Sequence, residues 1–360
     1  MKTVLHWLLV VAALAYVAFQ APALVRSVMA GGGQLHDVRW EWVAASLVLG
    51  LAAVAVYAEL HRQLLAVGGA RLPVGVVQSI TLGENAIANT VPVVGGAGSV
   101  AYAISRFRRR GVDSALSAWA VLLAGVLDTL CLIVLAAIAV AAIGRLPVQV
   151  VAIVVGLVGG AAVGAWALVT HPPVLRTVLR PVLWLDRFVP TQCTDCRDRR
   201  IADLDGMTNR VVARLGLLRP TPIQWSRVLG VTVLSWLVDF ANLAVAAFSV
   251  LQHVPWPALV VGFLVVQASI ALQVLPGGAG LAEVGLLGTL VAAGVPTGQA
   301  AVVVLIYRAS SWFVPAVVGW TAYAVHIHAT RPRLHRHQSY RSRPAIGGPA
   351  TAVAAENEHG

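Results

Sequence analysis

Long apolar stretches constrain the fold of this chain more than any other feature of its sequence. Several of them approach or exceed the roughly 20 residues that an α-helix needs to cross the hydrocarbon core of a bilayer. These stretches are Val4–Phe19, Trp42–Leu60, Ala115–Ile143, Val148–Thr170, Val228–Leu251 and Gly298–His326. Hydrophobic residues make up 58% of the chain and charged residues 11%, whereas soluble proteins carry about 25% charged residues. These proportions exclude a soluble enzyme, a secreted disulfide scaffold and a disordered protein. They predict an all-α polytopic membrane protein with about six full spans.

Basic residues predict the orientation of these spans. The chain has 26 Lys and Arg residues against 15 Asp and Glu residues, which gives a formal net charge of +11. If both termini are cytoplasmic, 22 of the cations fall on the cytoplasmic side, and only Arg26, Arg39 and Arg145 fall outside. This distribution follows the positive-inside rule. We therefore interpret the charge as a topology signal with anionic lipid headgroups as a second use, and nucleic acid is not needed to explain it.

Two further apolar segments, residues 73–105 and 257–294, are interrupted near their middles by Pro and Gly. The first contains Pro92–Gly98, with the sequence PVVGGAG, and the second contains Pro276–Gly280, with the sequence PGGAG. Irregular backbone survives at membrane depth only where it is buried in protein or lines a wet cavity. The pattern therefore predicts two re-entrant hairpins, each with a broken helix. The residues expected at the breaks are Pro92, Gly95, Gly98, Pro276, Gly277, Gly278 and Gly280.

The order of these features occurs twice along the chain. In each half a broken segment is followed by a Gly-Val turn, at Gly111 and at Gly294, and then by a full span. The first hairpin would begin and end in the cytoplasm and the second outside, which predicts inverted-topology repeats over about residues 42–143 and 228–326. Transporters built in this way bind substrate at the membrane midplane, between discontinuous helices. The alternative is that Pro276–Gly280 is an ordinary loop between two spans, which would place the Arg-rich tail outside.

At these residues the sequence resembles a known family, the transmembrane flippase domain of lysylphosphatidylglycerol synthases and its stand-alone relatives. The resemblance covers roughly residues 5–330. The second half carries it through Leu275–Glu283, Gly294–Pro296, Tyr307, Arg308 and Pro315, and the first half through Asn85, Asn89, Pro92, Gly95, Gly98 and Asp128. The acid–Arg pair that the family often has just before this Asp is replaced here by Ala124–Leu127, so no role of that pair is carried over.

The resemblance implies translocation of lipids, or of lipid-linked headgroups, between the leaflets of a bacterial cytoplasmic membrane. The soluble aminoacyl-transferase domain of the fused synthases has no counterpart in this sequence, so we carry over no synthase activity and expect no enzyme. We also expect no cofactor and no metal. Of three cysteines, Cys193 and Cys196 form a lone CxxC, which we interpret as two reduced thiols, because a zinc site needs further ligands.

Five charged residues lie inside apolar segments, namely Glu84, Asp128, Asp239, Glu283 and Arg308. Each costs at least about 2.5–3.5 kcal/mol near the bilayer centre, so such residues usually face a cavity or a partner. Arg308 is expected either to pair with Glu283, Asp128 or Asp239 or to bind a phosphate in bidentate fashion. Glu283 is expected either to cap the half-helix after the break or to meet a headgroup cation or a coupling proton.

The full set of candidate substrate-binding residues follows from these positions and from the resemblance. It comprises Arg308, Glu283, Asp128, Asp239, Glu84, Asn85, Asn89 and Tyr307. The asparagines have a second interpretation, in which they only satisfy backbone groups that the break leaves free. Histidines near the predicted interfaces, His61 among them, are given no role.

The remaining segments are predicted to be cytoplasmic. Residues 171–227 form a basic loop whose stretch 199–218 has the periodicity of an amphipathic helix, which would lie either on the inner leaflet or against the protein. Residues 331–360 are expected to be a basic, disordered tail after an integral membrane domain over residues 1–330.

We take the leading function to be translocation of a lipid headgroup, with anionic or headgroup-modified membrane lipids as partners. A second hypothesis is an ion-coupled carrier of a small anionic solute, which would need an aqueous path closed off from lipid. A third is a non-transporting membrane partner of a cytoplasmic glycosyl- or aminoacyl-transferase, a lipid-modifying enzyme docked through residues 171–227.

Overall fold

The computed structural model describes residues 38–91, 95–144, 147, 149–150, 152–157, 159–160, 221–272 and 275–329, with side chains as far as residue 325. Every regular element in these ranges is a helix, which confirms the all-α class. The predicted first span Val4–Phe19, residues 171–220 of the predicted basic loop with its two cysteines, the tail 331–360 and Pro92 lie outside the described residues. The predicted end of that loop is wrong, because its residues 222–227 already belong to a helix. Most of the predicted span Val148–Thr170 also lies outside them.

The helices before residue 145 begin with one long helix and end with another. They are α2 (Trp40–Val67), α3 (Val74–Thr90), α4 (Gly95–Arg109) and α5 (Ser114–Ala142). The helices after residue 220 start with the long α9 (Pro222–Phe248), followed by α10 (Trp256–Ala271), the 3₁₀ turn η3 (Pro276–Gly278) and α11 (Leu281–Ala292). The last helical run consists of α12 (Thr297–Arg308), the π-helical turn η4 (Ala309–Phe313) and α13 (Val314–Ala329).

Within the described ranges, four helical runs are long and apolar enough to cross a membrane: α2, α5, α9 and the run from Thr297 to Val325. They confirm four of the predicted spans, with boundaries shifted by a few residues. The shifts have local causes. α5 starts at its N-cap Asp113, whose carboxylate accepts hydrogen bonds from the backbone N–H groups of Ala115 and Leu116. α9 starts six residues before the predicted span because Thr221 and Gln224 form a capping box.

The helices of the two interrupted segments are each shorter than a span. α3, α4, α10 and α11 have 17, 15, 16 and 12 residues, against the roughly 20 that crossing requires. α3 packs on α4, and α10 packs on α11. Each segment is therefore a pair of short helices, as expected, and each pair lies between two long helical runs in chain order.

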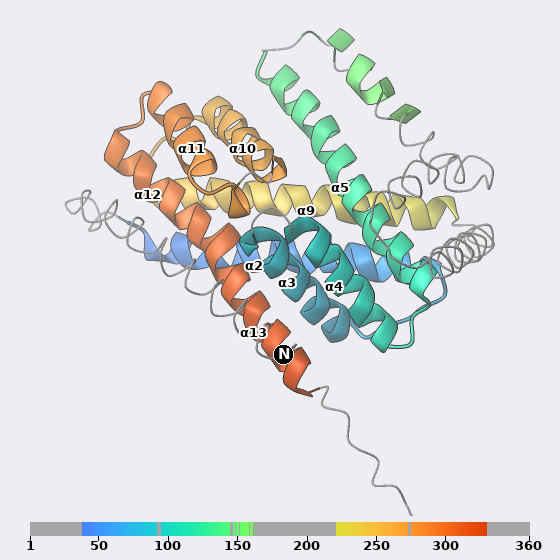
Figure 1. Cartoon of the computed structure of the whole chain (residues 1–360). Helices are drawn as coiled ribbons and strands as arrows, with labels where there is room; N and C mark the ends of the chain where they lie inside the picture. Colours follow the sequence, from blue (N-terminus) through green and yellow to red (C-terminus); the bar gives the residue numbers. More distant parts are fainter. Residues whose placement is uncertain are drawn as a thin grey trace, which may run out of the picture.

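Elements far apart in the sequence make the main packing contacts of the molecule. α2 and α9 run side by side over much of their length (Figure 1). α13 packs on α3, where a Cβ added to Gly319 would lie 2.2 Å from the Leu82 carbonyl oxygen. α3 also contacts η3, so the first helical pair touches the interruption of the second pair.

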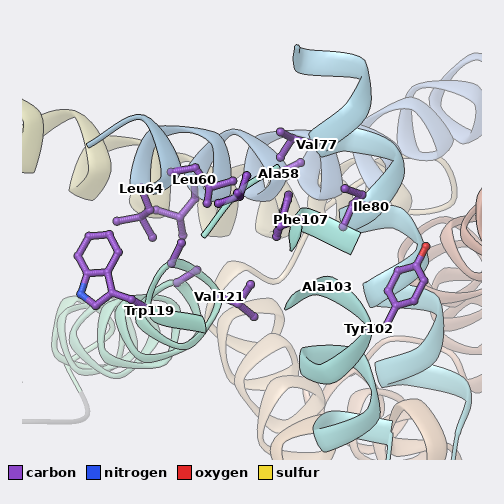
Figure 2. Packing of buried hydrophobic residues seen from close by; sticks show 14 of the residues in the cluster. Ala58, Leu60, Leu64, Val77, Ile80, Tyr102, Ala103, Phe107, Trp119 and Val121 are labelled. Atoms are coloured by element: carbon purple, nitrogen blue, oxygen red, sulfur yellow. The ribbon is translucent and has the colours of Figure 1, made fainter. Parts of the chain in front are cut away.

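The buried apolar side chains form two clusters. One is built on α2, α3, α4 and α5, and Figure 2 shows side chains of these four helices gathered around Ala58 and Phe107. Trp320 and Tyr323 of α13 complete this cluster. The other cluster is built on α9, α10, α11 and α12 and is centred on Leu243, Leu286 and Leu290. The last helical run therefore contributes to both clusters, through α13 to the first and through α12 to the second.

The last helical run contains a π turn, and Pro315 supplies a reason for it. A proline lacks the backbone N–H and crowds the carbonyl of the residue four positions earlier, here Ser311, in an α-helix. The wider turn over Ala309–Phe313 accommodates this residue without breaking the run. The π turn begins directly after Arg308. The side chains before and after this turn are therefore rotated about the helix axis relative to one another, compared with their positions in a regular α-helix.

Candidate functional site

The first break follows α3. Val91 has an extended backbone (φ −93°, ψ 119°), which is the conformation favoured before a proline, and Pro92 is the next residue. The amide of Asn89 donates to the Asn85 carbonyl at 3.1 Å, one turn earlier in the same helix. α4 begins at Gly95, where a Cβ would lie 2.8 Å from the Ala88 carbonyl oxygen. Gly98 lies within the first turn of α4, so its predicted place in the break is wrong by one turn of helix.

The second break begins like the first, with an extended residue before a proline, but the residues that follow adopt a different backbone conformation. Leu275, before Pro276, is extended with φ −120° and ψ 149°. The chain then turns through Gly277, Gly278 and Gly280 with positive φ angles of 58°, 67° and 84°, which residues with a Cβ rarely adopt. Three glycines therefore form this break, as the sequence predicts for these positions.

Glu283 lies in the first turn of α11 and serves that helix. One of its carboxylate oxygens, Oε2, accepts a hydrogen bond of 2.5 Å from the Gly280 backbone N–H. The capping interpretation is therefore correct for this oxygen. The other oxygen, Oε1, accepts from Arg308 Nε at 2.6 Å. One side chain thus stabilises the half-helix and holds a cation at the same time.

Arg308 is buried, with 2% of its surface exposed, and it holds the second break together. Besides its ion pair with Glu283, it donates from a terminal nitrogen to the Gly277 carbonyl oxygen at 2.7 Å. Among the described residues its carboxylate partner is Glu283, rather than Asp128 or Asp239. The Glu283 side chain is 33% exposed, so the ion pair is buried on the side of the cation and accessible on the side of the carboxylate.

Trp312 connects the two breaks. Its indole N–H donates to the Asn89 carbonyl oxygen at 3.2 Å, at the end of α3. The Arg308 guanidinium carbon lies 5.4 Å from the centre of its ring, within cation–π range. A Cβ on Gly277 would lie 2.2 Å from the indole nitrogen, so only glycine permits this approach. About two helical turns further on, the Trp320 indole N–H donates to Thr90 Oγ1 at 3.0 Å.

A small pocket opens where the two breaks face each other. From the first break it is lined by Ala88, Asn89, Val91, Gly95 and Gly96, and from the second by Ile270, Leu275, Pro276 and Gly277. The wall includes Gly95 and Gly96 at the start of α4, where the N–H groups of a helix carry partial positive charge. The Gly277 carbonyl that Arg308 holds belongs to a residue of this wall. The pocket can therefore accommodate a polar group that both breaks contact.

Asp239 and Tyr307 belong to a second polar group beside this site. Asp239 of α9 accepts from the Gln267 amide of α10 at 2.8 Å and from the Tyr307 hydroxyl at 3.3 Å. Asp128 of α5 lies near enough for its charge to act on Asp239, and its main-chain carbonyl accepts from Trp236 at 3.0 Å. Among the predicted residues, the structure therefore brings Asp239 to Tyr307 and leaves Asp128 outside the Arg308 ion pair.

A third polar group lies where the π turn meets two long helices. The Asn242 side-chain oxygen of α9 accepts from Ser46 of α2 at 2.6 Å and from Ser310 at 2.9 Å. Close approach makes this possible, because a Cβ on Gly50 would lie 2.1 Å from the Ser310 carbonyl oxygen. The turn that carries Arg308 and Trp312 is therefore fixed to α2 and α9.

Glu84 is buried in α3, about a helical turn and a half before the first break. Its nearest ionisable neighbour is His61 of α2, with 3.7 Å between Nε2 and Oε2. Asn85 lies beside it, partly buried. The structure thus separates the predicted candidates, with Glu283, Arg308 and Asn89 at the breaks and Glu84 in the interior of the first cluster.

Sequence reasoning missed Trp312, Gln267 and His61. Trp312 had a usable signal, since it lies four residues after Arg308 and therefore on the same face of a regular helix. Gln267 and His61 carried no usable signal in the sequence, because each is simply a polar residue inside or beside an apolar segment. Within the residues that the structure describes, no group of three His, Cys, Asp or Glu side chains is arranged to hold a metal ion.

Comparison with known proteins places this geometry in a family. A family model described as the lysylphosphatidylglycerol synthase TM region matches residues 4–319. No curated protein matches the chain.

Proposed function

This chain belongs to the family of the lysylphosphatidylglycerol synthase transmembrane region, and we propose that it moves a phospholipid or a lipid-linked headgroup between the leaflets of the cytoplasmic membrane. One observation carries the proposal. A buried Arg, paired with an accessible carboxylate, holds a backbone break that faces a second break across a pocket. Lipid phosphates are the ligands that such an Arg suits best.

We further propose that the two sets of helices are inverted-topology repeats. Their matching order supports this, since a long helix, a pair of short helices and another long helical run occur in both. The helices of each pair are too short to cross alone, which is what re-entrant hairpins require. The basic residues Arg106, Arg108 and Arg109 at the end of α4 favour a cytoplasmic side for the first pair, with both termini cytoplasmic.

In this mechanism the lipid phosphate competes for the Glu283 position on Arg308. An Arg has five N–H donors, so Arg308 can bind a phosphate while it keeps the Gly277 carbonyl. Glu283 would then be released toward a headgroup cation, while its other oxygen keeps the cap of α11. The acyl chains would remain in the lipid, and only the headgroup would pass between the breaks.

The proposal assigns no catalytic step to the chain and no cofactor. Its partners are membrane lipids, anionic or headgroup-modified, which the basic segments would gather on the cytoplasmic side at about 1 kcal/mol per cation. A cytoplasmic lipid-modifying enzyme would supply such a lipid, and the predicted contact for it is residues 171–227, of which residues 171–220 lie outside the described part of the chain.

A reconstituted assay tests this function. Vesicles of phosphatidylethanolamine and phosphatidylglycerol would contain phosphatidylglycerol labelled on its chain, and a membrane-impermeant quencher would report how much label reaches the outer leaflet. We expect the wild type to equilibrate the label and Arg308→Met and Glu283→Gln to lose most of the rate. The matched control is Arg62→Met, because Arg62 and Glu59 form an ion pair of 2.5 Å on the partly exposed face of α2. Equal rates in wild-type and empty vesicles would reject the function.

A further inference from the structure

His61 of α2 and Glu84 of α3 form a buried ionisable pair that the proposed site does not use. His61 has no exposed surface and Glu84 has 7%. Their closest atoms, Nε2 and Oε2, are 3.7 Å apart, beyond hydrogen-bond range. Neither atom has a hydrogen-bond partner within the described ranges, and the nearby hydroxyl of Thr81 lacks one too. Buried polar atoms of this kind usually have partners, so the group requires an explanation.

The surroundings of the pair offer it little compensating charge. The Tyr57 ring meets His61 edge-on, with ring centres 5.0 Å apart, and the Phe107 ring lies 6.2 Å away. α9 contributes the uncharged Val228 to the same cluster. Other titratable or charged groups on the helices around the pair are Tyr57 of α2, Tyr102 and Arg106 of α4, Asp128 of α5 and Tyr323 of α13, and of these Tyr57 and Tyr102 lie near enough to Glu84 for its charge to act on them. The one cation among them, Arg106, lies over the Tyr102 ring at 5.3 Å.

This environment limits how many protons the pair can hold. A bare carboxylate beside a neutral imidazole would leave one uncompensated charge in an apolar cluster, which is costly. One added proton removes the net charge, whether it stays on the carboxylate or forms an imidazolium–carboxylate pair. A second proton would leave an imidazolium beside a neutral acid and restore the cost. The pair is therefore suited to take up one proton, and a small approach of the two side chains would let them share it.

The pair is also placed where its charge can affect the first break. Glu84 lies five residues before Asn89, about 7.5 Å along the helix. Its neighbour Gly83 is in close contact with α4, since a Cβ there would lie 2.7 Å from the Tyr102 hydroxyl oxygen. The Leu82 carbonyl meets Gly319 of α13 on another side. A charge on Glu84 would have to draw in water or a partner between these close-packed helices, so α3 could not keep the same packing.

We propose that His61 and Glu84 are a proton-binding site whose loading sets the position of α3, and that it couples lipid movement to the proton gradient. This rests on the proposed function and adds its energy source. With one proton bound, α3 stays packed against α4 and α13, as in this structure. Loss of the proton charges the pair, favours a different packing of α3 and thereby moves the first break. Proton binding and headgroup binding would then each favour one of two conformations of the protein.

The test uses the full chain in the vesicles described above, with a pH gradient imposed in either direction. The wild type is expected to move labelled phosphatidylglycerol severalfold faster in one direction of the gradient than without it. Glu84→Gln and His61→Asn should move the lipid at one rate regardless of the gradient. The control is Glu59→Gln, a carboxylate on the same helix as His61 that is bonded to Arg62 near the surface and should keep the response.

A second measurement reads proton binding without transport. Infrared difference spectra of the purified protein between acidic and alkaline buffer should contain a signal of the shared proton, either the band of a buried carboxylic acid if Glu84 carries it or the bands of an imidazolium if His61 does. Glu84→Gln and His61→Asn should both lose this signal, and Glu59→Gln should retain it. Difference spectra of Glu84→Gln and His61→Asn that match the wild type would overturn the proton site. Lipid movement that ignores the gradient in the wild type would overturn the coupling and leave the proposed function intact. No movement in any condition would reject the proposed function, and the infrared result would still decide the proton site.

Discussion

Arg308 Nε lies 2.6 Å from Glu283 Oε1, and this ion pair joins the end of α12 to the first turn of α11, directly after the second helix break. The two residues differ strongly in exposure, at 3% for the Arg side chain and 33% for that of Glu. The two charges therefore depend on each other unequally. If the pair is broken, water can hydrate the Glu283 carboxylate, but it cannot reach the Arg308 guanidinium. A phosphate that replaces Glu283 would leave both charges compensated. This inequality is what suits the pair to exchange partners.

The same inequality gives a stability prediction. Glu283→Gln should lower the free energy of unfolding more than Arg308→Met, because it leaves a buried cation without its partner, a change that costs about 3–5 kcal/mol in buried pairs. Arg308→Met keeps much of the side-chain volume and leaves a carboxylate that can be hydrated. Denaturant unfolding in detergent measures both variants. Equal losses, or a larger loss for Arg308→Met, would contradict the assignment of the buried partner.

Gly277 should not tolerate even a methyl group. Gly277→Ala would place a Cβ 2.2 Å from the Trp312 indole nitrogen, at a φ of 58° that alone costs about 1–3 kcal/mol. We expect lower thermal stability and a loss of lipid movement. Gly288→Ala is the matched control, since Gly288 lies inside α11 with no atom within 4 Å of the added methyl. A variant at Gly277 as stable as the one at Gly288 would refute this close approach.

Trp312 should matter through its N–H group as well as its ring. Trp312→Phe removes the donor to the Asn89 carbonyl, which is worth about 1 kcal/mol, and weakens the cation–π contact with Arg308. We expect a modest drop in melting temperature and a larger drop in transport rate, because the two breaks lose a connection. Trp40→Phe, on a side chain that is 64% exposed, should change neither. An unchanged transport rate in Trp312→Phe would show that the connection is not needed.

Much of the architecture could be predicted from the sequence because membrane spans need long apolar runs. Four such runs are helices, and Pro92 and Pro276 end the preceding segments because the residue before a proline favours extended backbone. Glu283 was also predictable as a helix cap. These features depend on residues within a few positions of one another.

The contacts that assemble the site could not be predicted in the same way. Trp312 lies more than 200 positions from Asn89 in the chain. A tryptophan in an apolar helix can face lipid, pack in the protein core or belong to a binding site, so its sequence position alone does not assign its role. The choice of Glu283 over Asp128 or Asp239 as the partner of Arg308 depends on how α11 packs beside α12. The burial of His61 depends on α3 and α5 packing on α2 and on Phe107 of α4 lying beside its ring, which no local pattern in these helices encodes.

The most direct test asks whether headgroups pass between the two breaks. Leu275 lines the pocket and is 50% exposed, so a cysteine there can react with a charged thiol reagent. The variant Leu275→Cys would be made after Cys131, Cys193 and Cys196 are replaced by alanine, with Ile223→Cys, in the first turn of α9 and 65% exposed, as the control. Labelled phosphatidylglycerol movement would be measured before and after modification. We predict that modification at position 275 stops the movement and that modification at position 223 does not. Movement at the full rate through a protein modified at position 275 would contradict the central claim.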